Sequence, residues 1–108
     1  MNDCIFCKII KNEIPAEKIY EDNSILAFKD AFPKASPHIL VIPKKHITSF
    51  YDLAEIDSTM IAHLTCSLPK IARMVGLTNG FKTIVNTGED GGQEIYHLHY
   101  HILGTPSV

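Results

Sequence analysis

The period of apolar and polar positions changes several times along the chain, and each change predicts a different element. Residues 38–42 form an almost entirely apolar run closed by Pro43, which is typical of a buried strand at the centre of a sheet. Between residues 53 and 75 apolar side chains recur at helical spacing, and Gly76 suits the end of a helix. Polar and apolar residues alternate from 95 to 103, as they do in a strand with one apolar face.

Shorter segments complete the predicted order. Their patterns favour a short helix at residues 5–11 and strands at residues 18–21, 24–29 and 81–86. Pro69 lies inside the long helical region, where it removes a backbone donor and clashes with the preceding turn. We therefore expect either a kink or two helices that meet near Ser67. Strands around one long helical region predict the α+β class.

Length and composition limit the classes of protein. The chain has 108 residues without internal repeats or a linker, so we expect one domain over residues 1–108. Ten basic residues against twelve acidic ones give a net charge of −2, which argues against a nucleic-acid backbone or an anionic bilayer as partner. No apolar stretch approaches the roughly 18 residues of a membrane-spanning helix, and the first residues do not resemble a signal peptide. We therefore expect a cytoplasmic protein.

The three cysteines are unevenly spaced. Cys4 and Cys7 form a close pair near the start of the chain, whereas Cys66 stands alone in the long helical region. In a reducing compartment such a pair is more typical of a metal site or a redox feature than of a disulfide. We expect Cys66 to fill the core.

Three of the six histidines, His97, His99 and His101, stand at every second position near the carboxyl end, and we call them the histidine row. In a strand their rings project to one side, while Leu98 and Tyr100 face the other side and pack on the helices. Alternation alone would also allow a solvated polar face. One ion shared by all three is disfavoured, because His97 and His101 would stand roughly 13 Å apart along a strand, while metal–nitrogen bonds measure about 2.1 Å.

Separate roles along one substrate explain the row best, such as a nucleophile flanked by groups that bind phosphate oxygens or transfer protons. An imidazole with a pKa of about 6.5 is largely neutral at cellular pH, so it has a lone pair for attack and gains a proton easily. The glycine-rich loop at residues 88–93 could bring backbone N–H groups to anionic oxygens, although a plain hairpin loop would have the same composition. Phosphorus is therefore the natural target.

The histidine row, together with the residues on both sides of it, resembles the signature of the histidine triad (HIT) family of nucleotide-binding hydrolases. The three histidines are followed by Ile102-Leu103-Gly104 and preceded by residues 91–96. Further segments resemble the Hint-like branch of the family in order and spacing, namely residues 5–10, 13–16, 27–30, 38–46 and 85–86. The resemblance implies the family's α+β fold, an antiparallel sheet of about five strands with a long helical region, which forms a homodimer so that two sheets join into one.

The resemblance also implies a catalytic and binding set. His99 matches the histidine that attacks the α-phosphorus and carries a transient nucleotidyl group. His101 matches the phosphate-binding histidine, and His38 the residue that completes the hydrogen-bond relay behind the nucleophile. The nucleotide would contact an apolar base pocket, a ribose-binding carboxylate, and groups near the phosphates and leaving group: Phe6, Ile9 and Phe28; Asp30; and Asn86, Gly92, Gln93 and Glu94. The three apolar residues of the base pocket would be core residues in any fold, and Asp30 could merely open a turn.

A metal site follows from the same resemblance. Some bacterial members bind zinc through two N-terminal cysteines, the histidine after the Pro-Lys-Lys segment and the first histidine of the triad, which correspond here to Cys4, Cys7, His46 and His97. Two cysteines and two histidines are a common structural zinc site. If His97 binds zinc, it cannot also donate a proton to a leaving group and would instead rigidify the segment that carries His99. Without zinc, the cysteines would be small buried residues and His46 a surface side chain.

The implied activity is that of a nucleotidyl hydrolase without an organic cofactor, similar to a purine nucleoside phosphoramidase or a dinucleoside polyphosphate hydrolase. A purine nucleotide conjugate would be cleaved at the α-phosphorus through a nucleotidyl-His99 intermediate, and water would release the nucleoside monophosphate. Two other hypotheses stay open: a nucleotide-binding regulatory protein with incidental hydrolysis, and a zinc-dependent hydrolase that uses the triad as ligands. Glu94 stands where many Hint members have serine, so the leaving group is also open.

Overall fold

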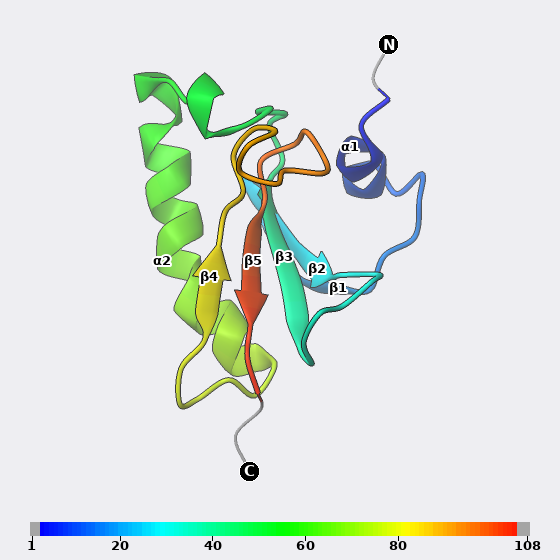
Figure 1. Ribbon diagram of the computed structural model, residues 1–108, viewed down its shortest axis with the longest axis vertical. Coiled ribbons are helices and arrows are strands. Elements are labelled where there is room, and N and C mark those ends of the chain that lie inside the picture. The colour runs from blue at the N-terminus through cyan, green and yellow to red at the C-terminus, as the bar shows by residue number, and fades with distance from the viewer. Residues whose placement is uncertain (1–2, 106–108) are drawn as a thin grey trace.

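A central antiparallel sheet organises the fold, which a computed structural model describes for residues 3–105 (Figure 1). The five strands are β1 (Lys18–Glu21), β2 (Ile25–Lys29), β3 (His38–Pro43), β4 (Lys82–Ile84) and β5 (Tyr100–Leu103). Their spatial order is β1-β2-β3-β5-β4, and every neighbouring pair is antiparallel. The predicted α+β class and the central place of β3 are confirmed.

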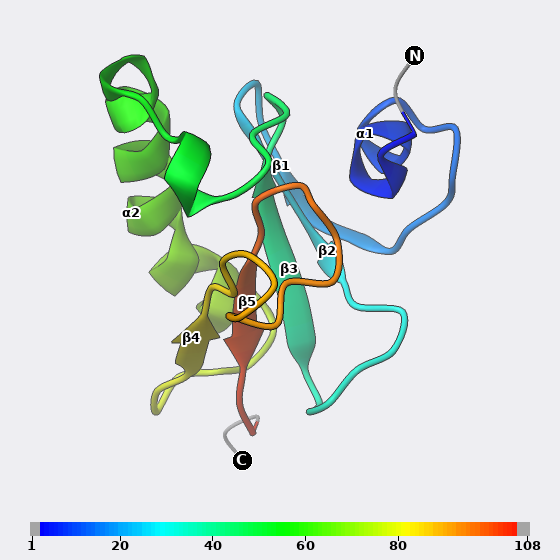
Figure 2. The same ribbon diagram turned by 45° about the horizontal axis from the view of Figure 1, so that its top comes forward.

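Two helices cover the sheet from opposite faces, α1 (Ile5–Ile10) and α2 (Ser58–Met74) (Figure 2). Two short 3₁₀ turns, η1 (Phe50–Asp52) and η2 (Glu55–Asp57), precede α2. Because strand side chains alternate between faces, there are two apolar cores. The larger one lies under α2 and includes Leu98, Tyr100 and Ile102; the smaller one consists of Phe6, Ile9, Leu26, Phe28, Leu40 and Ile42. Within residues 3–105, neither helix has the length and apolar character that crossing a bilayer requires.

The last strand is shorter than the alternation predicts. β5 begins at Tyr100 rather than at residue 95, so His97 and His99 precede the strand. The partner strand gives the reason, because β3 ends at Pro43, which has no N–H to contribute to the ladder. The strand predicted at residues 81–86 is shorter too, because β4 spans only Lys82–Ile84.

The long helical region is divided differently from the prediction. Its first residues form η1 and η2, and α2 then runs without interruption through Pro69, so the expectation of two helices that meet near Ser67 is wrong. The Ser67 hydroxyl donates to the carbonyl of His63, and Leu68 and its neighbours are buried, so packing on the sheet compensates for the donor that proline lacks. Cys66 is exposed on the outer side of α2 and does not fill the core, contrary to expectation.

The turn between β1 and β2 is joined to α2 by a carboxylate. Asp22 Oδ1 accepts hydrogen bonds from the backbone N–H groups of Ser24 and Ile25, at 2.8 and 3.0 Å, and Oδ2 accepts from the Tyr20 hydroxyl and from His63 Nε2, at 2.8 and 2.7 Å. Burial alone would raise the pKa of this carboxyl, but the hydrogen bonds from Ser24, His63 and Tyr20 outweigh it and hold the pKa below its ordinary value. The ionised carboxylate thus connects the turn to the helix.

Replacing this carboxylate tests the connection. We expect Asp22→Asn to lower the free energy of unfolding by about 1–2 kcal/mol at pH 7, because the charge-assisted hydrogen bonds are lost. The wild-type advantage is present above the unfolded-state pKa of about 3.9 and disappears as the pH falls toward the lower folded-state value. Urea titrations between pH 2 and 7 measure this; the exposed Asp52→Asn should serve as a control with little effect. Equal stability of Asp22→Asn and wild type at pH 7 would contradict the prediction.

Candidate active site and metal centre

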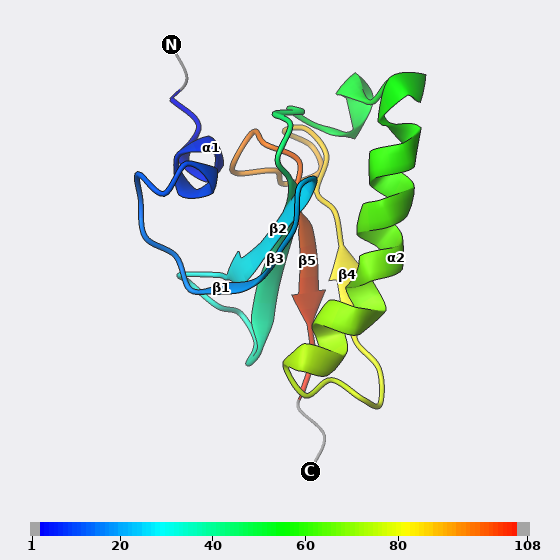
Figure 3. The same cartoon turned by 180° about the vertical axis from the view of Figure 1, so that it is seen from behind.

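The histidine row lies on the face of the sheet opposite α2. Figure 3 shows α1 beside the segment that leads into β5 at one end of the sheet. The ring of Phe6, from α1, packs edge-on against His99 and His97, with ring centroids 5.3 and 5.9 Å apart. The rings of His99 and His101 are 5.0 Å apart. Although two members precede the strand, the row keeps the common face that its alternation predicts.

His99 has a defined tautomer. Its Nδ1 lies 2.7 Å from the backbone carbonyl oxygen of His97, and the side chain is only 7% exposed. A carbonyl oxygen can only accept, so Nδ1 must carry the proton of the neutral ring. The lone pair is therefore on Nε2. This arrangement gives His99 an unprotonated nitrogen that can act as a nucleophile.

His101 and His38 form a relay with one direction of hydrogen bonding. The backbone N–H of Lys34 donates to His38 Nδ1 at 3.1 Å, so the proton of the neutral His38 ring is on Nε2. His38 Nε2 then donates to His101 Nδ1 at 2.8 Å, which leaves the proton of the neutral His101 ring on its own Nε2. That second N–H remains as a donor for an anionic oxygen. The residues of β3, β5 and the loop between β2 and β3 build the relay together.

Burial keeps both rings of the relay neutral at neutral pH. It lowers the pKa of His38, with Lys34 and His99 adding to the effect and the Asp30 carboxylate opposing it. Burial also lowers the pKa of His101 to about 4, and the proximity of His99 and His38 contributes in the same direction. Sequence analysis missed Lys34, because a backbone N–H has no residue-type signature.

Asp30 lies beside the relay and also closes a turn. Its Oδ2 is 3.4 Å from His38 Nε2, while Oδ1 accepts from the backbone N–H of Phe32 at 2.8 Å. Ligand atoms of Asp30, His38 and His101 gather within 4.8 Å, as a metal site would require. Metal binding there does not fit the hydrogen bonds, because Lys34 occupies the lone pair of His38 Nδ1 and Nε2 must carry a proton.

The apolar and phosphate-side residues occupy different places. Phe6, Ile9 and Phe28 are buried together in the core under α1, with the Phe6 and Phe28 ring centroids 5.4 Å apart. In the loop before β5, the Asn86 amide donates to the carbonyl of Gly91 at 2.8 Å, and Gly92 adopts a positive φ of 79°. The side chain of Gln93 is buried against backbone groups.

Glu94 faces another part of the molecule. It lines an open cavity of about 440 Å³ together with Asp3, Tyr96, Cys4 and His46. The last two belong to the predicted metal set, so the carboxylate lies on the side of that set. Glu94 therefore lies next to two of the predicted metal ligands.

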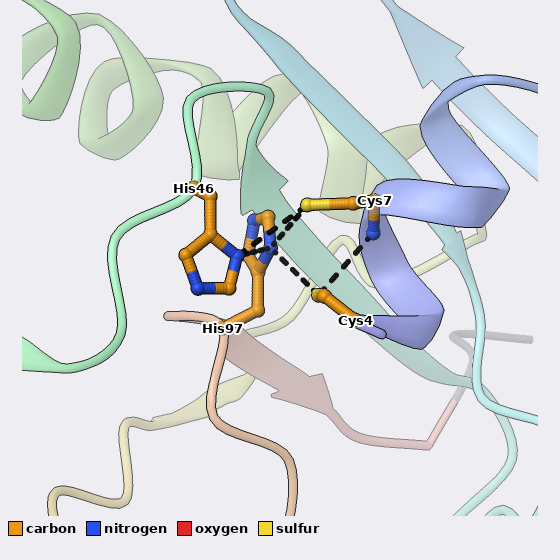
Figure 4. A group of neighbouring side chains, drawn as sticks. All are labelled: Cys4, Cys7, His46 and His97. Atoms are coloured by element: carbon orange, nitrogen blue, oxygen red, sulfur yellow. Dashed lines mark hydrogen bonds between the residues drawn. The ribbon is translucent and has the colours of Figure 1, made fainter. Parts of the chain in front are cut away.

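Cys4, Cys7, His46 and His97 converge on one point, from α1, the segment after β3 and the segment before β5 (Figure 4). Their sulfur–nitrogen distances are 3.3, 3.4 and 3.6 Å, and the two Nδ1 atoms are 3.2 Å apart. For zinc–sulfur bonds of about 2.3 Å and zinc–nitrogen bonds of about 2.05 Å, a tetrahedron has sulfur–nitrogen edges of about 3.6 Å and nitrogen–nitrogen edges of about 3.3 Å. The arrangement matches a four-coordinate ion closely.

The tautomer of His97 fits the same interpretation. Its Nε2 lies 2.8 Å from the carbonyl oxygen of Pro43, so Nε2 carries the proton and the Nδ1 lone pair faces the two sulfurs and His46. One lone pair cannot satisfy three neighbours by hydrogen bonding, whereas a cation satisfies all of them. Burial lowers the pKa of His97 to about 4 and, as the largest cause, raises the pKa of the Cys4 thiol. Among residues 3–105, no candidate ligand group contains all three members of the histidine row.

Comparisons with known proteins identify the family of the chain. The family profile described as scavenger mRNA decapping enzyme C-term binding matches residues 3–108. Protein HitA of Neisseria gonorrhoeae is 49% identical over 106 residues, which cover 98% of this chain and 99% of HitA. A histidine triad protein from Clostridium difficile has 48% identity and a TM-score of 0.92, with 100% of this chain and 95% of that chain covered. A HIT family hydrolase from Legionella pneumophila has 43% identity and a TM-score of 0.92, with 97% and 95% covered. The chain therefore belongs to the histidine triad family.

Proposed function

We propose that this protein is a nucleotidyl hydrolase of the Hint-like kind, which cleaves purine nucleoside phosphoramidates or related nucleotide conjugates at the α-phosphorus. The observation that carries the proposal is the hydrogen bond between His99 Nδ1 and the carbonyl of His97, which leaves the Nε2 lone pair for attack. The similarity to a named HIT family hydrolase supports the hydrolytic reaction.

The reaction has two displacements at one phosphorus. His99 Nε2 attacks, a phosphorus–nitrogen bond to the ring forms, and the bond to the leaving amine breaks as that amine takes up a proton from solvent. Water then attacks the same phosphorus and the bond to Nε2 breaks. The nucleoside monophosphate leaves, the proton of water passes to solvent, and His99 is restored.

The relay stabilises the charge that develops in both steps. The Nε2–H of His101 donates to a non-bridging phosphate oxygen, while His38 and the Lys34 backbone hold that ring in the required tautomer. Phe6, Ile9 and Phe28 supply the apolar surface for the base, and Asp30 is the carboxylate for the ribose. Asn86, Gly92 and Glu94 are the proposed contacts near the phosphates and the leaving group.

Zinc is the metal that suits the cluster of two cysteines and two histidines. Cys4, Cys7, His46 and His97 would hold it, and with four protein ligands it would supply rigidity rather than a reactive water. His97 then positions the segment before His99 instead of protonating the leaving group. Metal analysis of protein purified without added zinc tests this: close to one equivalent is expected, and less than about 0.2 equivalents would reject the site.

Three further properties belong to the same proposal. We propose that two copies form a homodimer with a joined sheet, so light scattering should give about twice 12.1 kDa. Zinc-bound thiolates suit the reducing conditions of the cytoplasm. A purine nucleotide small molecule, rather than nucleic acid or membrane, is the proposed partner.

A substrate panel tests the function directly. It compares an adenosine phosphoramidate, a dinucleoside polyphosphate and an adenylylated lysine, with release of AMP as the readout. The proposal predicts turnover of at least one of them, fastest for the phosphoramidate. Tight AMP binding with negligible turnover of every conjugate would instead identify a nucleotide-binding regulatory protein.

A further inference from the structure

The segment before β5 lacks a continuous ladder at the place where the nucleophile must be held. β3 ends at Pro43 and β5 begins at Tyr100, so residues 95–99 lie beyond the regular pairing of the two strands. Two backbone carbonyls on the β3 side still accept from this segment: Ile47 O accepts from Leu98 N at 2.6 Å, and Pro43 O from His97 Nε2 at 2.8 Å. Other contacts must hold the rest of residues 95–99 in place.

Gln93 supplies contacts to three backbone segments at once. Its side-chain oxygen accepts from the N–H of Gly88 at 2.9 Å, and its amide nitrogen donates to the carbonyls of Thr48 and Ile95, at 2.7 and 3.0 Å. The two hydrogens of the amide are thereby used within the protein, and the side chain is only 6% exposed. Its backbone N–H also donates to the carbonyl of Gly88, at 3.0 Å.

We propose that the Gln93 side chain is a positioning residue for His99, which replaces the missing ladder between the segment after β3 and the segment before β5, rather than a direct phosphate contact. The inference rests on the proposed nucleophilic role of His99. Thr48 follows Ile47, whose carbonyl accepts the hydrogen bond from Leu98 N–H. The Gln93 amide therefore holds the segment after β3 and the segment before β5 together next to that hydrogen bond. A direct contact with phosphate would need an amide hydrogen that the carbonyls of Thr48 and Ile95 already hold.

Two variants separate positioning from binding. Gln93→Met keeps the length of the side chain and removes all three hydrogen bonds, while Gln93→Glu can still accept from Gly88 but, when ionised, has no hydrogen for the two carbonyls. We expect each to lower kcat by about 10- to 100-fold, because small displacements of a nucleophile have effects of that size. The Kd for AMP should stay within about threefold of wild type. Asp22→Asn, whose expected loss of stability arises far from the row, should keep the wild-type kcat.

Hydrogen exchange gives a readout that does not depend on turnover. Leu98 N–H is buried and bonded to Ile47 O, so in Gln93→Met its exchange should accelerate at least tenfold relative to Val41 in the centre of β3. In Asp22→Asn the ratio of the two rates should not change. If wild type hydrolyses no conjugate, the proposed function fails, and this ratio still tests the positioning role.

The outcomes divide clearly. A lower kcat with an unchanged Kd, or a selective loss of protection at Leu98, supports the proposal. A Kd raised tenfold or more with an unchanged kcat overturns it and makes Gln93 a phosphate contact. Wild-type kcat together with wild-type protection also overturns it. If Gln93→Met does not fold, Gln93→Glu decides, and failure of both to fold would overturn the proposal, because Gln93 would then maintain the whole fold.

Discussion

Replacing His99 with asparagine is expected to abolish turnover of a nucleoside phosphoramidate, with kcat lower by at least about 10³-fold. That loss corresponds to about 4 kcal/mol or more of transition-state stabilisation. The reason is the loss of the Nε2 lone pair that the hydrogen bond to the His97 carbonyl holds in place. AMP binding should be largely retained, because the relay of His38 and His101 and the apolar cluster under α1 do not depend on the nucleophile. Steady-state kinetics and calorimetry measure the two quantities.

A matched variant separates this effect from the loss of any histidine. His63 lies on α2, outside the site, and its ring is hydrogen-bonded to Asp22, so His63→Asn should keep the wild-type kcat. Rapid quenching during turnover should trap a nucleotidyl group on wild type and none on His99→Asn. If His99→Asn keeps a tenth or more of the rate, nucleophilic catalysis by His99 is refuted.

Removal of the proposed zinc is expected to lower the stability more than any substitution considered above. Zinc that bound only the folded chain would contribute about 4 kcal/mol when its free concentration is a thousand times the Kd. A chelator, or Cys7→Ser, should therefore lower Tm by more than about 10 °C. Scanning calorimetry with and without chelator measures the shift.

The chain offers its own control for this experiment. Cys66 is exposed on α2 and takes no part in the cluster, so Cys66→Ser should keep both the Tm and the response to chelator. An unchanged Tm of wild type after complete metal removal would show that metal binding contributes nothing to stability.

Local patterns predicted the elements whose exposure to solvent follows a regular pattern along the chain. The apolar run at residues 38–42 identified the central strand, since a strand buried on both faces needs no alternation. The alternation of the histidine row correctly indicated a shared face. The predicted strand was too long, because its hydrogen bonds to β3 depend on Pro43, which lies more than 50 positions earlier in the chain and has no N–H to donate. Periodicity contains no information about the partner strand.

The proposed metal ligands were easier to predict than contacts that depend on the backbone. The cysteines and histidines of the proposed zinc set do converge, as the resemblance to the family implied. The Lys34 N–H that sets the tautomer of His38, and the carbonyls that occupy the Gln93 amide, have no such signature. Sequence also did not decide whether Pro69 kinks one helix or separates two, since that outcome depends on how firmly α2 packs on the sheet.

The four-residue cluster also has a consequence for the order of events during biosynthesis. Cys4 and His97 are 93 positions apart, so an ion held by both would close a loop of nearly the whole chain. A nascent polypeptide could not complete the coordination sphere until His97 had left the ribosome. Metal capture would then follow the synthesis of β1, β2 and α2, which would have had time to form.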